Sequence, residues 1–330
     1  MDDPKPPGRA ERAFAVLNPA SGSADDGVRK AIEREFGGVR APVEFHETAE
    51  DEDMSAVVGD AVGRGADLII AAGGDGTVSA VANGLVGANN GDGRGAVLGI
   101  VPLGTANVLA RELGMPLDVE IAAKALAGPH ELRSVDAMRI DGRCYFTQVG
   151  VGIDALMIRD TDTATKKRFG RAAYIWTAIT NLIGFEPRRF TLTIDGKVVK
   201  RRATQVVVAN VGSMGDPRFR WGPQIRVDDG TLDICVVSAK TMFDYAKVVW
   251  HVVRRQHHLS PNIRYYHATK SVEIALGKPL PVQADGEVIG DTPVRIDLIS
   301  GAIRVAVPVG ATAAVEEAEP GSPAADPWVP

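Results

Sequence analysis

A buried strand, a polar or glycine-rich turn and a helix follow one another three times within the first 114 residues. The apolar segments at 13–17, 67–72 and 96–102 have the length and composition of buried strands. Each runs into a turn rich in Gly, Asn, Ser or Thr, and a helical pattern begins directly after it. Such alternation predicts a parallel sheet in an α/β domain, where ligands bind at the carboxyl ends of the strands.

After about residue 133 the pattern changes to alternating, β-branched strands joined by Asp-Gly turns, which is typical of an antiparallel sheet or sandwich. The chain has 330 residues, and single cores stop growing at roughly 250–300, so we expect two domains. We predict a disordered lead at 1–11, an α/β domain at 12–133 that the strand at 300–309 could rejoin, a β-sandwich at 134–299, and a disordered tail at 310–330.

Charge is unevenly divided along the chain, although the whole sequence carries a formal net charge of −5. Residues 1–150 hold 14 Lys and Arg against 23 Asp and Glu, whereas residues 151–310 have a net charge of +8. A basic second half suits an anionic surface such as a bilayer, and ordinary solvated side chains are the alternative. With only 5% aromatic residues the chain offers no base-stacking platform, so we expect no nucleic acid partner.

The N-terminal sequence, the apolar runs and the cysteines all favour a cytoplasmic location for this protein. The N-terminal residues carry Pro and acid where a signal peptide needs an apolar core, and no apolar run approaches the roughly 18–20 residues of a membrane span. Cys144 and Cys235 lie in strand-like segments without CxxC spacing, so we predict buried thiols in a reducing compartment.

Two helix candidates, 166–185 and 245–258, combine an apolar face with a basic end. Both could lie at a bilayer surface, with Trp250 at the interface of the second. The alternative is that these helices pack against the sandwich, because such amphipathicity is common.

The segment Gly73–Thr77 (GGDGT) lies where a buried strand meets a helix, so its amides can converge on an anion while its glycines let phosphate oxygens approach. A purely structural tight turn is the alternative. Neither a Walker P-loop nor a GxGxxG fingerprint is present, so the common nucleotide folds are not supported. A carboxylate such as Asp75 suits polyphosphate chiefly when a divalent cation lies between them.

Six short blocks span nearly the whole chain: Asn18–Gly22, Gly73–Thr77 with Asn83-Gly84, Pro102–Asn107 with Ala110-Arg111, Gly150–Asp154, Asp229–Asp233 and Asp285–Glu287. Taken together, they resemble the diacylglycerol kinase catalytic family, whose bacterial members include broader lipid kinases, and more distantly the sphingosine kinases. The blocks follow the family's order.

The resemblance implies an ATP-dependent lipid kinase with an α/β domain, like that of NAD kinases and diacylglycerol kinases, and a β-sandwich domain. Asp285 and Glu287 match the Asp-Gly-Glu motif that supplies the general base and its partner, which is reasonable because an attacking hydroxyl needs a carboxylate to accept its proton. Without the family, Asp-Gly between apolar strands would predict a simple hairpin. The residues expected to line the ATP site are Asn18, Ser21, Gly22, Thr48, Gly74, Asp75, Gly76, Thr77 and Thr105.

The resemblance also implies Mg²⁺, with Asp154 near the cleft through water and with Asp229 and the backbone at Thr231 in a structural magnesium loop. Arg226 stands where another acidic ligand is expected, and its presence weakens a site that wants about six oxygen ligands. Two further departures from the family pattern, Ser23 and Ser79-Ala80, are expected to alter phosphate contacts without abolishing activity.

We therefore expect a cytoplasmic kinase, peripherally associated with a membrane that presents its lipid substrate; the oligomeric state is left open, a homodimer included. An NAD kinase-like enzyme is the first alternative, although its expected Thr-Gly-Ser-Thr-Ala-Tyr block is absent. The second is a nucleotide-binding membrane adaptor without catalysis, against which the presence of both Asp285 and Glu287 argues.

Overall fold

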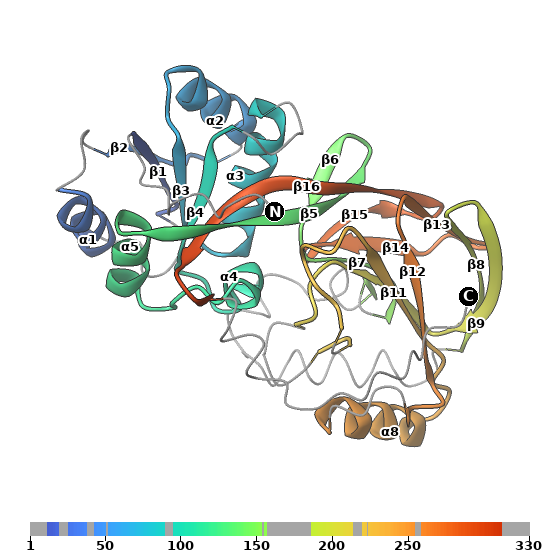
Figure 1. Ribbon diagram of the computed structural model, residues 1–330. Coiled ribbons are helices and arrows are strands. Elements are labelled where there is room, and N and C mark those ends of the chain that lie inside the picture. Colours follow the sequence, from blue (N-terminus) through green and yellow to red (C-terminus); the bar gives the residue numbers. More distant parts are fainter. Residues whose placement is uncertain are drawn as a thin grey trace, which may run out of the picture. The chain divides into compact units, whose positions relative to one another are not determined.

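The computed structural model forms two compact units (Figure 1). One comprises the described residues within Met1–Ala137 and Ile299–Ala324, and the other those within Met138–Met214 and Arg218–Leu298. The structure describes residues 12–19, 26–37, 43–50, 52–89, 95–153, 155–156, 186–213, 220–222, 224–254 and 259–311.

The first unit is built on a parallel sheet with the strand order β2-β1-β3-β4. Neighbouring strands are in register, with Ala13 opposite Leu68 and Leu68 opposite Val97, and the three central strands are almost completely buried. This burial explains their nearly continuous apolar sequences. The strands are β1 (Ala13–Leu17), β2 (Glu44–Glu47), β3 (Leu68–Gly73) and β4 (Val97–Pro102).

Helices connect the strands of the first unit, and acidic side chains begin two of them. The carboxylate of Asp53 accepts hydrogen bonds from two amides at the start of α2, and that of Asp118 accepts one from Ile121 in α5. The helices are α1 (Asp26–Phe36), α2 (Met54–Gly63), α3 (Asp75–Ala88), α4 (Val108–Glu112) and α5 (Val119–Ala127).

The long strand β16 (Val294–Pro308) runs from the second unit into the first. Its residue Val305 pairs in parallel with Leu98 of β4, and it also pairs with β5 (His130–Ile140). The sequence left open whether residues 300–309 return to the first domain. The pairing of Val305 with Leu98 is the kind of contact that such a return requires.

The described strands of the second unit pair with one another in antiparallel fashion. One sheet has the order β12-β11-β10-β7-β14-β15, and in the other the first part of β16 is followed by β13, β8 and β9. The strands are β6 (Arg143–Tyr145), β7 (Gln148–Gly152), β8 (Arg188–Ile194), β9 (Lys197–Ala203), β10 (Gln205–Ala209), β11 (Leu232–Val237), β12 (Ile263–Ala268), β13 (Ser271–Leu276), β14 (Pro281–Ala284) and β15 (Glu287–Asp291).

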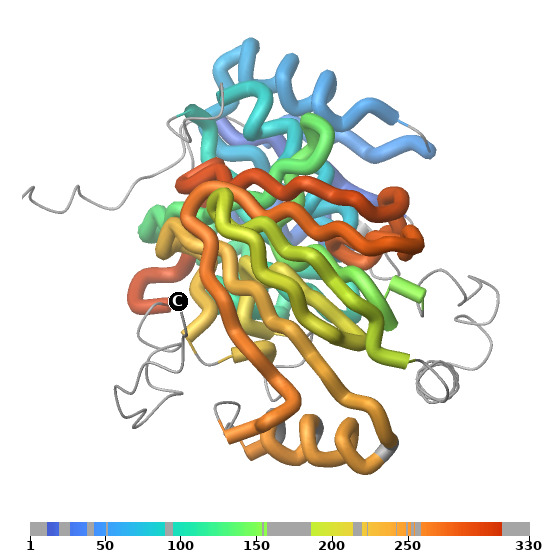
Figure 2. The backbone as a smooth tube through the Cα atoms, turned by 90° about the vertical axis from the view of Figure 1, so that its right-hand side faces the viewer, coloured from blue at the N-terminus to red at the C-terminus, as the bar shows by residue number. Residues whose placement is uncertain are grey.

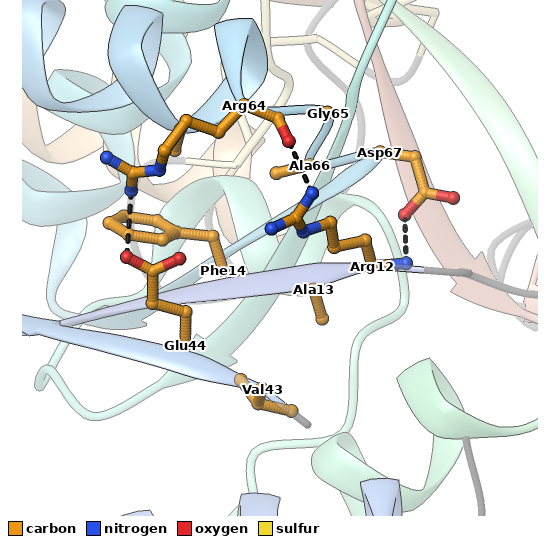
Figure 3. A pocket seen from close by; sticks show the side chains of 10 residues that line it. Arg12, Ala13, Phe14, Val43, Glu44, Arg64, Gly65, Ala66 and Asp67 are labelled. Atoms are coloured by element: carbon orange, nitrogen blue, oxygen red, sulfur yellow. Dashed lines mark hydrogen bonds and ion pairs between the residues drawn. The ribbon is translucent and has the colours of Figure 1, made fainter. Parts of the chain in front are cut away.

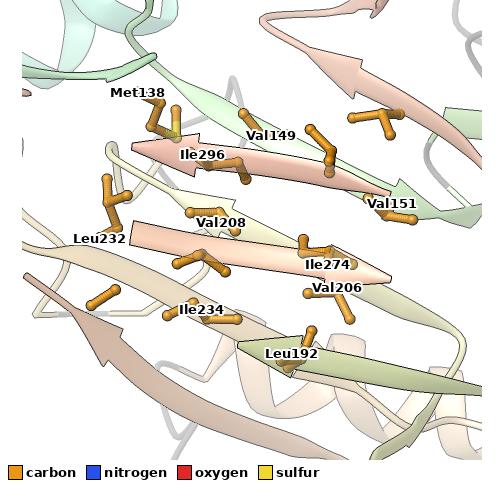
Figure 4. Packing of buried hydrophobic residues seen from close by; sticks show 14 of the residues in the cluster. Met138, Val149, Val151, Leu192, Val206, Val208, Leu232, Ile234, Ile274 and Ile296 are labelled. Carbon is orange, nitrogen blue, oxygen red and sulfur yellow. The ribbon is translucent and has the colours of Figure 1, made fainter. Parts of the chain in front are cut away.

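A single apolar cluster fills the space between these two sheets (Figure 4). Val149, Val206 and Ile234 come from one sheet, and Leu192 and Ile274 come from the other. Alternation along each strand brings these side chains to one face, as expected for sheets that pack face to face. A parallel α/β unit and an antiparallel unit confirm the fold class predicted from the sequence.

One helix of the second unit, α8 (Met242–Val253), corresponds to the later of the two amphipathic segments. In Figures 1 and 2 it lies beyond the ends of the strands of its unit. The earlier segment, 166–185, the lead at 1–11 and most of the tail lie outside the described residues. None of the helices in the described part of the chain has the length and apolarity needed to cross a bilayer.

Candidate functional site

Four of the predicted nucleotide-site residues lie just after the carboxyl ends of neighbouring parallel strands. Thr48 follows β2, Asn18 follows β1, Gly74 follows β3, and Thr105 comes shortly after β4. The amide of Thr48 donates to the carbonyl of Leu17, and that of Asn18 donates to the carbonyl of Ala72, so the loops are tied across the strands. The structure thus brings these residues to one edge of the sheet, where open α/β sheets bind ligands.

Two glycine turns meet at this edge. A Cβ atom on Gly104 would lie 2.7 Å from the Cα of Gly74, and the amide of Leu103 donates to the carbonyl of Gly73 at 2.9 Å. No side chain at position 104 fits against a backbone that approaches so closely, which explains the glycine there.

Asp75 ties the two turns together through its carboxylate. Its Oδ2 accepts a hydrogen bond from the amide of Asn107 at 2.9 Å, and its Oδ1 accepts one from the amide of Val108 at 2.6 Å. These amides open α4, so Asp75, the first residue of α3, also caps the next helix. The sequence predicted Asp75 beside phosphate or a cation and did not predict this bridging contact.

A second contact joins the first sequence block to the GGDGT turn. The side-chain amide of Asn18 donates to the hydroxyl of Thr77 at 2.9 Å. Ser21 and Gly22 of the same block lie outside the described residues. A hydrogen bond between two predicted site residues therefore ties Asn18 to the start of α3.

The pocket of Figure 3 lies at the opposite edge of the same sheet, where strands β1, β2 and β3 begin. It has a volume of about 860 Å³, and its lining includes Arg12, Glu44, Arg64 and Asp67. The guanidinium of Arg12 donates to the carbonyl of Arg64, whose own guanidinium lies 2.8 Å from Glu44. Because ligands of parallel sheets bind at the carboxyl edge, we do not place the candidate site in this pocket.

In the second unit, Asp285 occupies the turn between β14 and β15, with a φ of 47°. Its carboxylate accepts hydrogen bonds from the amides of Phe146 (2.9 Å), Thr147 (2.9 Å) and Gln148 (3.2 Å) and from the Thr147 hydroxyl (2.6 Å). A carboxylate has about four lone-pair sites, so these donors use most of its accepting capacity. Asp285 therefore anchors the loop before β7, which is a role the sequence did not predict.

Glu287 has a different environment from Asp285. It begins β15, its side chain is 60% exposed, and its Oε2 lies 3.5 Å from Nη2 of Arg143. An exposed ion pair of this length holds a side chain weakly. The acidic pair of the Asp-Gly-Glu motif thus consists of one fixed carboxylate and one that is free to meet a ligand, and the catalytic assignment of both stays a prediction.

Three polar residues around this turn were missed by sequence reasoning. Nε1 of Trp221 donates to Oε1 of Gln148 at 2.6 Å, and the completely buried Gln283 accepts from the amide of Gly286. Gln148 precedes the Gly150–Asp154 block, and Gln283 precedes the Asp-Gly-Glu motif. Polar residues inside apolar strands were the available signal.

A contact between a buried carboxylate and a partly exposed histidine was also missed. Asp233 on β11 faces His267 on β12, with 2.9 Å between Oδ1 and Nδ1, and only 3% of the Asp233 side chain is exposed. Burial raises the pKa of Asp233, and the bond to His267 opposes that rise. Asp233 belongs to the sequence block Asp229–Asp233, which had been assigned to a metal loop.

That loop offers few oxygens for a cation. Oδ1 of Asp229 accepts from both the amide and the hydroxyl of Thr231, and Arg226 pairs with Asp228 at 3.2 Å. Across the described residues no group of three or more His, Cys, Asp or Glu side chains could hold a metal ion, and Asp154 lies outside them. The described residues alone do not fit a six-oxygen cation site, so the magnesium assignment stays a prediction.

Family models match both halves of the chain. Residues 12–140 match the diacylglycerol kinase catalytic domain, and residues 147–307 match the YegS C-terminal NAD kinase beta sandwich-like domain. Residues 12–140 therefore form a diacylglycerol kinase catalytic domain by this match. This confirms the resemblance drawn from the six sequence blocks.

Relatives in this family include a diacylglycerol kinase of Bacillus subtilis, 26% identical over 299 residues that cover 90% of this chain and 97% of the relative. A protein of Stenotrophomonas maltophilia named as a YegS-like lipid kinase is 29% identical over 89% of this chain and 96% of its own. An uncharacterized Synechocystis protein is 30% identical, and this chain spans 56% of its length.

Solved structures show the same fold. A candidate diacylglycerol kinase of Bacillus anthracis superposes with a TM-score of 0.76 at 25% identity, covering 93% of this chain and 98% of that one. A second structure from the same organism gives a TM-score of 0.74 at 26% identity.

Proposed function

We propose that this protein transfers the γ-phosphoryl group of ATP to a hydroxyl of diacylglycerol or a related membrane lipid. The observation that carries the proposal is the gathering of Asn18, Thr48, Gly74 and Thr105 at the carboxyl edge of the parallel sheet, in a chain of a lipid kinase family. ATP follows from kinase chemistry, and the lipid acceptor follows from the names of the relatives.

The start of α3 is suited to hold polyphosphate. The helix is 14 residues long, and its N-cap residue, Gly74, has no side chain to cover the first amides. Amides at such a helix start and the positive end of the helix dipole both favour an anion. A Cβ atom on the exposed Gly76 would meet no atom within 4 Å, so an oxygen of the nucleotide can approach the backbone there.

The acidic pair Asp285 and Glu287 supplies the proton acceptor in this proposal. As the lipid hydroxyl oxygen attacks the γ-phosphorus, the bond to ADP breaks and the hydroxyl proton passes to a carboxylate. Mg²⁺, expected with ATP, supplies neutralisation of phosphate charge when it is bound. The acceptor is held in a bilayer, so we propose a cytoplasmic protein that associates peripherally with the membrane.

Incubation of the purified full chain with γ-labelled ATP, Mg²⁺ and mixed micelles of diacylglycerol tests the proposal. Labelled phosphatidic acid is the expected product. Parallel reactions with NAD test the NAD kinase-like alternative, for which labelled NADP is the diagnostic product. Nucleotide binding without any labelled product from diacylglycerol, NAD or a lipid extract of the native host would favour the non-catalytic adaptor and overturn the kinase proposal.

A further inference from the structure

One face of α8 is exposed and carries two aromatic rings with basic side chains between and after them. Phe243 is 69% exposed and Trp250 is 57% exposed, and Lys247 and Arg254, which directly follows the end of the helix, complete the row with spacings of four, three and four residues. At 100° per residue these four side chains fall within an arc of about 60°. We call these four residues the outer face of α8.

The other side of the helix is turned toward its own unit. Tyr245 lies about 160° around the helix from Lys247; its hydroxyl oxygen is buried, and burial raises its pKa. Figures 1 and 2 both show α8 at one end of the second unit, beyond the strands. The outer face therefore points away from the unit that holds the helix.

Each exposed ring on the outer face has a cation over it. Nζ of Lys247 lies 4.6 Å from the ring centroid of Phe243, and Cζ of Arg254 lies 4.4 Å from that of Trp250. Neither basic residue forms an ion pair with any described residue. The outer face thus combines apolar rings with positive charge that no ion pair of the described residues neutralises.

The acid on α8 offsets this charge only in part. Asp244 accepts hydrogen bonds from the amides of Lys240 and Thr241 at the start of the helix; these bonds lower its pKa, and the charge of Lys247 lowers it further by a smaller amount. One carboxylate thus stands against the two cations of the outer face. Residues 151–310 carry a net charge of +8, so the surroundings of α8 in the sequence are basic as well. A partner of this face must accept two aromatic rings and supply negative charge.

We propose that the outer face of α8 is a docking surface for an anionic lipid bilayer. Phe243 and Trp250 enter the boundary between headgroups and acyl chains, and Lys247 and Arg254 lie beside anionic headgroups. The helix has 12 residues, too few to span a bilayer, so it lies along the surface. The inference deepens the proposed lipid kinase function and rests on it only for the identity of the substrate.

Co-sedimentation of the full chain with vesicles measures this docking without ATP. We expect binding to equal mixtures of phosphatidylcholine and phosphatidylglycerol and weak binding to phosphatidylcholine alone. Phe243→Ala with Trp250→Ala should lower the partition coefficient at least about tenfold. Lys247→Gln and Arg254→Gln should each lower it about fivefold on anionic vesicles only.

A matched control lies on α5 in the first unit. Ile121 is 57% exposed, like Trp250, and Lys124 is exposed on the same helix. Ile121→Ala with Lys124→Gln removes one exposed apolar side chain and one positive charge from another helix, and we expect unchanged vesicle binding. Circular dichroism and the midpoint of thermal unfolding establish whether each variant is folded. We expect every variant to fold, because substitutions at exposed positions usually change stability little.

A second readout reports contact directly. The exposed Ala246 lies beside the outer face, and the native thiols of Cys144 and Cys235 are buried. An environment-sensitive fluorophore on an Ala246→Cys variant should shift to shorter wavelength with anionic vesicles. An unchanged spectrum while the chain sediments with vesicles would locate the membrane contact elsewhere and overturn the proposal.

Two further outcomes complete the test. Light scattering tests whether the outer face joins two copies of the chain. If replacing Phe243 and Trp250 abolishes a dimer and leaves vesicle binding unaffected, the outer face is a contact between copies and the proposal is overturned.

A soluble substrate separates docking from chemistry. With a short-chain diacylglycerol below its micellar concentration, outer-face variants should turn over like the wild type. Failure of the wild type itself in that assay would count against the kinase function, whereas docking would still be judged by sedimentation.

Discussion

Two aspartates of the predicted site, one in each unit, hold backbone amides with their carboxylates. Asp75 accepts from the amides of Asn107 and Val108, and Asp285 accepts from three amides and a hydroxyl. Hydrogen bonds to an ionised acceptor are stronger than neutral ones, so each carboxylate fixes the shape of a loop. Both residues therefore position their surroundings, whatever chemistry they also perform.

Asp75→Ala should weaken binding of an ATP analogue about tenfold or more, because α4 and the second glycine turn lose their anchor. Loss of a helix cap costs about 0.5–2 kcal/mol in the free energy of unfolding. Asp118→Ala removes the cap of α5, a single bond to Ile121, and is the matched control. Urea unfolding should show a loss of stability in both variants, whereas calorimetric titration should show a loss of affinity for the ATP analogue in Asp75→Ala alone. Unchanged affinity in Asp75→Ala would contradict its role as the anchor of the second glycine turn.

Asp285→Asn should abolish phosphoryl transfer and leave binding of an ATP analogue nearly intact. The amide keeps the shape of the side chain but cannot accept the proton, and its NH₂ group would face donors that need an acceptor. We also expect a loss of about 1–3 kcal/mol in the free energy of unfolding. Full turnover by this variant would rule out the base assignment.

Glu287→Gln separates anchoring from chemistry. Its exposed contact with Arg143 contributes little to stability, so the variant should unfold like the wild type. A lower turnover number at unchanged stability would show that Glu287 acts in the reaction, whereas unchanged turnover would leave Asp285 as the sole acidic candidate of the motif.

At the scale of elements, the apolar pattern predicted the parallel strands closely. Segments 67–72 and 96–102 became β3 (Leu68–Gly73) and β4 (Val97–Pro102) because fully buried strands have nearly continuous apolar sequences. The bond between Asp285 and Phe146 joins residues 139 positions apart, and no local periodicity reveals such a contact. The sequence therefore predicted which segments carry the site, but not which side chains hold its loops.

The close approach of the two glycine turns gives a prediction at this scale. Gly104→Ala puts a Cβ atom 2.7 Å from the Cα of Gly74, and this backbone atom cannot move away without shifting the turn. We therefore expect the free energy of unfolding to fall by about 1–3 kcal/mol and nucleotide binding to weaken. Gly76→Ala meets no atom within 4 Å and gains helix propensity worth up to about 1 kcal/mol. That variant should keep or gain stability yet bind the ATP analogue less tightly, because the methyl group occupies the phosphate approach. Unimpaired affinity in Gly76→Ala would move the phosphates away from this turn.

For the molecule as a whole, pH dependence of stability should come in part from the second unit, where Asp233 is buried against His267. Burial raises its pKa in the folded state above the unfolded value of about 3.9. Below that unfolded value the carboxyl group is neutral in both states and carries no ionisation penalty. As pH rises toward the folded pKa, the unfolded state loses its proton first, so the free energy of unfolding falls.

Asp233→Asn removes this titration and should be the more stable protein by a margin that grows with pH. The margin increases from the unfolded pKa up to the raised folded pKa and then levels off, at about 1.4 kcal/mol for each unit of the difference. Because the bond to His267 opposes the effect of burial on the pKa of Asp233, the two side chains at position 233 should be compared in a His267→Gln background, by urea unfolding across the acid range. A margin independent of pH would mean that Asp233 ionises as easily in the folded chain as in the unfolded one, so its burial would not oppose the charge, and the contact with His267 would be an ordinary surface pair.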